Sequence, residues 1–139
     1  PLGFAERKDK VIKWSELTDL KTYTIGVVQD YINTTDFDKM VASKTLKTST
    51  TTSDTKNLLK LVNGRLDLAV IDENVMNYLF KTDKALAKKV GSAQFNATLL
   101  EDKNLFICFK KNAQGEELTK IYNEGLKKID IPSIMSQYL

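Results

Sequence analysis

Polar stretches rich in Thr, Ser and Asp stand directly before three segments with helical patterns. The side chains that they offer to a ligand are those of Tyr31, Thr34, Thr35, Thr51, Thr52, Ser53 and Asp72. A helix N-terminus suits a carboxylate or phosphate, because its free N–H groups and its dipole are positive there. Hydroxyl groups add donors, and the Asp72 carboxylate would hold an ammonium group. The residues therefore predict a zwitterionic ligand, and a free amino acid fits that description.

Helix capping is the alternative role of the same residues, because Ser, Thr and Asp side chains accept hydrogen bonds from the first free N–H groups of a helix. The candidate caps are Thr34, Thr35 or Asp36 for one helix and Ser53 or Asp54 for the next. Asp72 ends an apolar run just before Glu73, so it is expected to cap a helix, meet a ligand, or do both. The Tyr31 side chain is expected either to stack on a ligand or to pack against the protein, and both roles stay open. Trp14 is expected to pack.

The composition excludes several classes of function. The chain has 139 residues, a net charge of +3, one Cys and no His, so it is expected to hold one domain without a Cys-His pair, a Ser-His-Asp triad or a zinc site of the usual ligands. It carries no GxGxxG or GxxxxGK[ST] phosphate motif, and hence no cofactor is expected. Nucleic-acid binding is disfavoured because Arg7 and Arg65 are the only arginines. We expect a binding protein rather than an enzyme.

Strand and helix patterns alternate along the chain. Strands are expected at residues 22–28, 46–52, 66–72, 94–100 and 104–111, and helical segments at 11–20, 36–43, 53–62, 73–90 and 116–129. Ser15 is a candidate cap of the first helical segment, and residues 73–90 form one helix or two. Asn63-Gly64 is a typical left-handed helix end. Cys108 is expected to be buried in the last strand.

Alternation of this kind predicts an α/β sandwich of three layers with a mostly parallel sheet. Ligands of such sheets bind at the carboxyl ends of the strands, beside helix N-termini. This arrangement would bring the loops at residues 29–36, 50–54 and 72–74 to one edge of the sheet.

The order of motifs resembles the bacterial extracellular solute-binding proteins of family 3, the substrate-binding subunits of polar amino acid ABC transporters. The matching stretches are "ERKDKVIKWSELTDLKTYTIGVVQDY", "TSDTKNLLKLVNGRLDLAVIDENVMNYL", "NLFICFKKN" and "EELTKIYNEGLKKI". The most specific of them is "LVNGRLDLAVID". The resemblance implies a lobe of the type II periplasmic-binding-protein fold, in which a crossing strand carries the R-K-D run.

Members of this family close two lobes around their ligand, and residues 1–139 resemble the second lobe. Residues 104–139 resemble the segment that returns to the first lobe, most of which has no counterpart here. The resemblance assigns the loop at Tyr31–Thr35 to the carboxylate end of the ligand and Asp72 to its amino group, with Thr51–Ser53 as a further contact. The loop "VVQDYINTTD" departs from the usual G-(S/T)-(S/T) turn, which leaves the ligand class open.

The resemblance further implies a membrane permease as partner and a periplasmic or extracellular location, with a membrane anchor as an alternative. A second function with the same fold is the ligand-sensing domain of a signal-transduction protein or transcription regulator. In the family, the segment at residues 104–111 and the helix at 116–129 pack on the first lobe. We therefore expect them either to bury against the sheet of this chain or to associate with a second copy.

Overall fold

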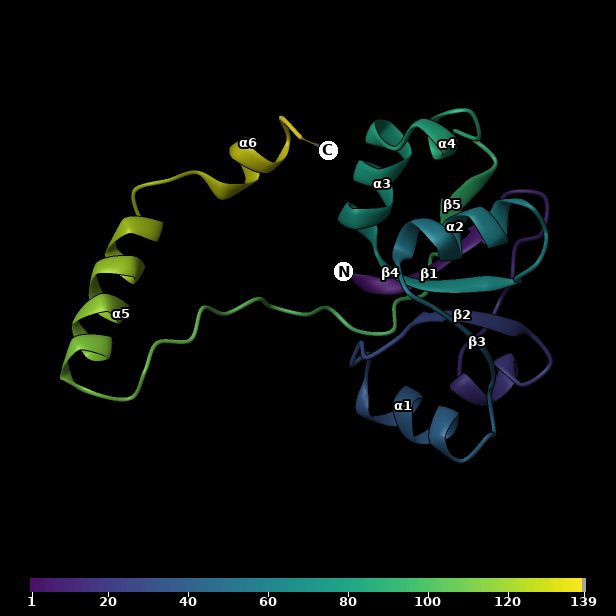
Figure 1. Cartoon of the computed structure of the whole chain (residues 1–139), viewed down its shortest axis with the longest axis horizontal. Helices are drawn as coiled ribbons and strands as arrows, with labels where there is room; N and C mark the ends of the chain where they lie inside the picture. Colours follow the sequence, from purple (N-terminus) through teal and green to yellow (C-terminus); the bar gives the residue numbers. More distant parts are fainter. Residues whose placement is uncertain (139) are drawn as a thin grey trace. The chain divides into compact units, whose positions relative to one another are not determined.

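Five strands form one mixed sheet in the order β3-β2-β4-β1-β5 (Figure 1). They are β1 (Leu2–Arg7), β2 (Thr24–Val28), β3 (Lys47–Thr51), β4 (Leu68–Asp72) and β5 (Ala93–Phe95). In this computed structural model, which describes residues 1–138, β2 pairs in parallel with β3 and β4. β1 runs antiparallel to both β4 and β5. All strands except β1 thus point the same way, which confirms the mostly parallel sheet.

Helices cover both faces of this sheet. The helical elements of the chain are the 3-10 helix η1 (Leu17–Leu20), α1 (Thr35–Ala42), α2 (Asp54–Val62), α3 (Glu73–Thr82), α4 (Lys84–Ala87), α5 (Ala113–Leu126) and α6 (Ile131–Met135). Figure 1 shows α2, α3 and α4 on one face and α1 on the other. None of the helices in residues 1–138 is both long enough and apolar enough to span a bilayer.

The core divides into two clusters, one on each face, because strand side chains alternate in direction. From β4, Leu68 and Val70 join Phe37 of α1 in the first cluster. Ala69 and Ile71 of the same strand join the cluster with Leu58, Leu61 and Met76. The expected three-layer sandwich, with a central strand that is apolar on both faces, is therefore confirmed.

Short polar side chains set the starts of the helices. The Thr34 hydroxyl accepts a hydrogen bond from the Phe37 N–H at 3.3 Å, and the Ser53 hydroxyl accepts one from Lys56 N–H at 3.3 Å. Gly64 ends α2 with a φ of 72°, as the left-handed exit requires. Asp83 ends α3 and caps α4, so that residues 73–90 form two helices.

The amino-terminal part of the chain differs from the pattern-based assignment. Leu2–Arg7 is a strand that the hydrophobic pattern did not predict, and only Arg7 of the R-K-D run assigned to a crossing strand lies in it. Glu6 interrupts the apolar pattern, yet it is buried, because its carboxylate accepts hydrogen bonds from Ile12 N–H, the Asn96 amide and the Gln94 amide. Only Leu17–Leu20 of residues 11–20 is helical, with Glu16 rather than Ser15 as cap.

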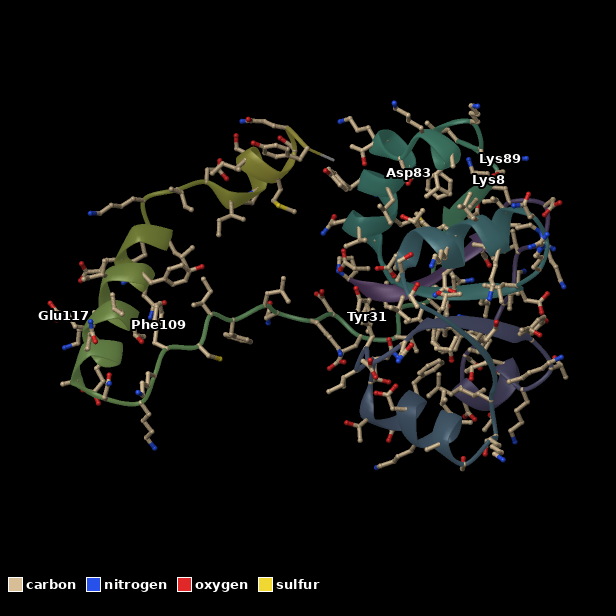
Figure 2. The ribbon with its side chains drawn as sticks, in the orientation of Figure 1. Lys8, Tyr31, Asp83, Lys89, Phe109 and Glu117 are labelled. Atoms are coloured by element: carbon tan, nitrogen blue, oxygen red, sulfur yellow. The ribbon has the colours of Figure 1, made fainter. Side chains whose placement is uncertain are left out.

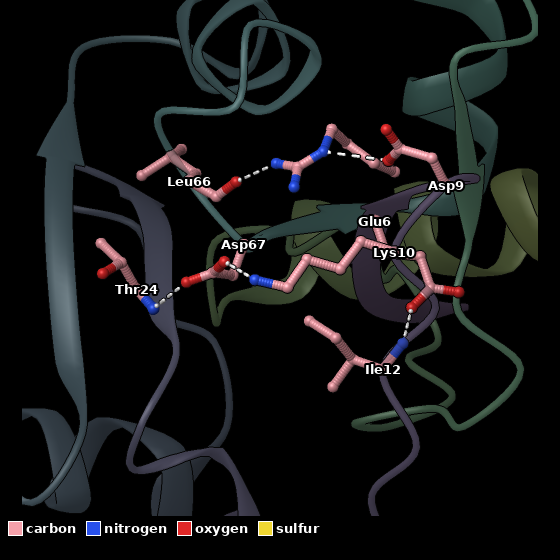
Figure 3. A network of polar contacts seen from close by, with 8 residues as sticks. Glu6, Asp9, Lys10, Ile12, Thr24, Leu66 and Asp67 are labelled. Carbon is pink, nitrogen blue, oxygen red and sulfur yellow. Dashed lines mark hydrogen bonds and ion pairs between the residues drawn. The ribbon is translucent and has the colours of Figure 1, made fainter.

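A polar network lies at the end of the sheet opposite to the carboxyl ends of β2 and β4 (Figure 3). Asp67 accepts hydrogen bonds from Lys10 Nζ at 2.7 Å and from the Thr24 N–H at 2.8 Å. Arg7 donates to the Leu66 carbonyl at 3.0 Å. Burial alone would raise the pKa of Asp67, but the bonds from Lys10 and Thr24 and the charges of Lys10 and Arg7 outweigh it and lower the pKa.

The chain divides into two compact units, Pro1–Lys103 and Asn104–Leu139. Within the second unit, as far as Tyr138, residues 104–111 form no strand, and Cys108 is exposed. The predictions of a strand and a buried Cys at this place are wrong, because apolar residues form a strand only where a neighbouring strand offers hydrogen bonds. Leu105 is 98% exposed and Phe106 is 82% exposed.

Candidate ligand-binding site

A pocket of about 160 Å³ lies at the carboxyl ends of the central strands, the edge that the sequence predicts for a ligand. Its lining residues are Leu2, Tyr31, Asn33, Asp54, Val70, Ile71, Asp72 and Val75. Leu2 reaches this edge because β1 is antiparallel and pairs Leu2 with Asp72. The loop after β2 contributes Tyr31, which is labelled in Figure 2, and Asn33.

Asp72 uses its two carboxylate oxygens differently. Oδ1 accepts hydrogen bonds from the N–H groups of Asn74 at 2.8 Å and Val75 at 3.3 Å, and so caps α3. Oδ2 takes no part in the cap. One oxygen therefore serves the helix, while the other is not used by it.

Asp54 is the second carboxylate of the pocket. It is the first residue of α2, directly after the cap Ser53. Burial raises the pKa of Asp54 above its usual range, although hydrogen bonds from its own backbone N–H and from the Tyr31 hydroxyl lower it in part. This carboxyl group is therefore held in surroundings that oppose its ionised form.

Asn33 holds the loop between β2 and α1 in shape. Its backbone N–H and its side-chain amide donate hydrogen bonds to the Asp38 carboxylate at 3.0 and 3.2 Å. Its carbonyl oxygen accepts a hydrogen bond from Lys103. These contacts keep Asn33 buried at the pocket and orient the loop that carries Tyr31, whose side chain is 59% exposed.

The structure places the other predicted ligand residues outside this pocket. Thr34 and Ser53 act as N-caps, and Thr35 is exposed in the first turn of α1. Thr51 and Thr52 line a separate, open hollow of about 380 Å³ with Lys56, Leu59 and Lys60. Among the seven predicted residues, the pocket thus brings together Tyr31 and Asp72. Trp14 packs as expected, 5.5 Å from Phe4 between ring centres, and donates a hydrogen bond to Asn96.

Several lining residues were not predicted as ligand contacts. Both Asn33 and Asp54 lie in loops that were predicted at the ligand edge, but Asp54 was named individually only as a helix cap, and Asn33 was not named as a ligand residue. Val75 lies one helical turn after Asp72, so the two residues share one face of α3. Once Asp72 is placed in the pocket, this spacing predicts that Val75 lines the pocket too. To predict Leu2 as a lining residue, one would need the strand register between β1 and β4, which no local pattern gives.

Charge defines what the pocket can hold. Two carboxylates, Asp54 and Asp72, line it, and no Lys or Arg does so within residues 1–138. Leu2, Val70, Ile71 and Val75 supply apolar walls. Carboxylates beside apolar surface suit a ligand that joins a cationic group to a hydrocarbon part.

The chain matches no protein-family model, and no curated protein matches it by sequence. Solved structures do match. An amino acid ABC transporter substrate-binding protein from Streptococcus pneumoniae, bound to L-arginine, matches with a TM-score of 0.66 and 17% identity, over 99% of this chain and 54% of that one. Domain 2 of an arginine-binding protein from T. maritima matches with a TM-score of 0.53 and 20% identity, over 73% of this chain and 100% of that one.

The periplasmic VFT2 domain of BvgS from Bordetella pertussis also matches, with a TM-score of 0.61 and 16% identity, over 99% of this chain and 56% of that one. The chain thus spans about half the length of two of these three structures. The third structure is a single domain, and this chain covers all of it. We conclude that the chain has the fold of a type II periplasmic-binding-protein lobe.

Proposed function

We propose that this chain is part of the substrate-binding component of an ABC transporter and that it binds a small polar solute, an amino acid, between two closing lobes. The observation that carries the proposal is the position of Asp72, which lines a pocket on the carboxyl edge of the sheet and uses only Oδ1 to cap α3. The similarity in fold to an amino acid ABC transporter substrate-binding protein supports it.

In this proposal, binding needs no covalent chemistry. The ammonium group of the amino acid would pair with Oδ2 of Asp72, while Oδ1 continues to cap α3. The ligand carboxylate would meet the N-terminus of α1 near Thr34 and Thr35, where free N–H groups favour an anion. A first lobe outside this chain would form the opposite wall, and contacts from both lobes would favour the closed state.

The proposed partner is a membrane permease that receives the solute from the closed protein, and the proposed location is periplasmic or extracellular. Solute capture followed by release to a permease requires reversible closure rather than catalysis. The pocket supports this role because its polar groups offer hydrogen bonds and charge to a solute.

A thermal-shift screen tests the proposal. The twenty amino acids and small polyamines are added to this chain and to the longer protein of which it forms a lobe. A ligand that binds the folded state raises the unfolding temperature. We expect a shift with at least one amino acid, larger in the longer protein because both walls are present. Absence of any shift in either protein would overturn the proposal.

A sensory role is the second candidate, and the similarity in fold to the BvgS VFT2 domain favours it. The same pocket would then report a solute to a membrane kinase or regulator instead of delivering it. Sequencing the gene around this segment distinguishes the two. A transmembrane segment leading to a kinase domain would support the sensor, and a neighbouring permease gene would support the transporter.

A further inference from the structure

We infer that Asp54 is a specificity-determining residue of this pocket, which pairs with a second positive charge on the ligand and so selects cationic amino acids over neutral ones of the same shape. The inference rests on the proposed function, because it concerns the same ligand. It adds a role that the helix-capping pattern of the sequence does not suggest.

Geometry places the two carboxylates in one small space from different elements. Asp72 comes from the end of β4, and Asp54 comes from the first turn of α2. Both line the pocket of about 160 Å³, with Val70, Ile71 and Val75 as apolar surface beside them. A ligand whose α-ammonium meets Asp72 can therefore direct its side chain along apolar surface toward Asp54.

Cations of the protein do not neutralise Asp54. Lys103 donates to the Asn33 carbonyl and lies 3.7 Å from Glu101, and Lys56 donates to the Thr52 hydroxyl at 2.7 Å. Within residues 1–138, no ion pair within 4.0 Å of the Asp54 carboxylate is found. Asp67, by contrast, is held by Lys10 at 2.7 Å.

Asp54 is half-buried, and a half-buried carboxylate without a cation is destabilised because it loses part of the hydration that its ionised form needs. Burial indeed holds the pKa of Asp54 above its usual range. A ligand cation would supply the missing partner and stabilise the ionised form. The Tyr31 side chain lines the same pocket as Asp54.

Neutral side chains of the same shape offer a direct test. L-citrulline replaces the guanidinium group of L-arginine by an uncharged ureido group of nearly the same size. Isothermal titration calorimetry compares both ligands on this chain and on the longer protein that contains the first lobe. We expect arginine to bind about tenfold more tightly than citrulline or better, because a buried charge pair is lost with citrulline.

Two variants assign the preference to Asp54. Asp54→Asn is expected to lower the arginine-to-citrulline ratio by about tenfold and to leave citrulline binding within about threefold, since only the charge is removed. Asp54→Glu keeps the charge and is expected to keep most of the preference. The matched control is Asp36→Asn, which removes a carboxylate from the first turn of the neighbouring helix α1, away from the pocket lining.

The outcomes separate this inference from the proposed function. Equal binding of arginine and citrulline by the unchanged chain and the longer protein would overturn the inference alone, since an amino acid still binds. An unchanged ratio in a folded Asp54→Asn variant would do the same. Should no amino acid bind either protein, the proposed function itself fails. If Asp54→Asn does not fold, the arginine-to-citrulline affinity ratios of the unchanged protein and of Asp54→Glu still test the inference.

Discussion

Asp72 caps α3 and also lines the pocket. Its Oδ1 accepts hydrogen bonds from two N–H groups of α3, and its Oδ2 takes no part in the cap. Of the two roles that the sequence leaves open, the cap is present in the structure, and the ligand contact stays a prediction. The two oxygens can be separated experimentally, because Asn retains the cap acceptor but not the charge.

We expect Asp72→Asn to weaken amino acid binding by about tenfold or more, because the charge-assisted bond to the ligand ammonium is lost. Its stability should fall by less than that of Asp72→Ala, which also loses the cap and about 1 kcal/mol with it. Urea unfolding and calorimetry measure the two quantities. Equal stability losses in both variants would contradict the assignment of Oδ1 to the cap.

Asp54 gives a prediction for the pH dependence of stability. Burial raises the pKa of Asp54 in the folded chain above its ordinary value, so the folded state binds a proton more tightly than the unfolded state. The contribution of this group to stability therefore falls as pH rises from its unfolded pKa through the raised pKa. Asp54→Asn cannot lose a proton and is expected to lack this decrease.

Urea unfolding of both proteins at several pH values between about 3 and 7 checks the sign. The unfolding free energy of Asp54→Asn, relative to the unchanged chain, should increase with pH over this interval. A decrease would show that the Asp54 carboxylate is stabilised by the fold. Asp36→Asn again serves as the control, because the Asp36 side chain is 82% exposed.

Sequence patterns identify residue types at this edge better than residue roles. Tyr31 and Asp72 were predicted as ligand residues and lie in the pocket, whereas Thr51 and Thr52 lie in a different hollow. Ser53 and Asp54 were equal candidates for one cap, and the structure gives the cap to Ser53 and the pocket to Asp54. Adjacent polar residues at a helix start point in different directions, which one-dimensional patterns do not resolve.

At the scale of elements, the contact between β2 and α2 is unusually close at Gly26. A Cβ at this position would lie 2.5 Å from Leu66 Cδ1 and 2.7 Å from Asn57 Oδ1. Gly26 therefore permits α2 to approach the sheet and to place its N-terminus, with Asp54, at the pocket. Asn57 is buried there, and neither its side-chain oxygen nor its nitrogen has a hydrogen-bond partner.

We expect Gly26→Ala to lower the unfolding free energy by about 1–3 kcal/mol, because the added methyl group overpacks this contact. Thermal unfolding followed by circular dichroism measures the effect. Gly125→Ala in α5 is the control, since a Cβ there meets nothing within 4 Å, and it should increase helix content instead. A neutral effect of Gly26→Ala would show that α2 can move away from the sheet.

Element types were largely predictable, and the exceptions have physical causes. Three alternating strand-helix pairs, β2–α1, β3–α2 and β4–α3, follow from local patterns. β1 contains the charged residue Glu6, which the hydrophobic pattern reads as exposed but which three donors satisfy in the interior. Residues 104–111 have a strand-like sequence, yet a strand also needs a partner strand, and sequence alone does not supply that information.

The two units of the chain differ in how far their apolar side chains are buried. Pro1–Lys103 contains the complete sheet and both core clusters. In Asn104–Leu139, Leu105, Phe106 and Ile121 remain largely exposed. Exposed apolar groups of this extent favour association. Residues 104–111 form no strand, and both alternatives, burial against the sheet and association with a second copy, stay predictions.

We expect the 139-residue chain to self-associate with rising concentration and a version ending at Lys103 to remain monomeric. Size-exclusion chromatography with light scattering measures both masses. The shorter version should retain the thermal unfolding midpoint of the sheet, because its core is complete. A monomeric full chain at all concentrations would contradict the association, and an unfolded short version would contradict the independence of the first unit.

The antiparallel bridge between Leu2 and Glu101 has a consequence for engineering. The Leu2 N–H donates to the Glu101 carbonyl at 2.8 Å, so the polypeptide enters and leaves this lobe at adjacent points. Such a segment can be spliced into a surface loop of an unrelated protein without opening either partner. Because Leu2 also lines the pocket, the graft would join its host beside the bound solute, and occupancy of the pocket would act directly on the junction.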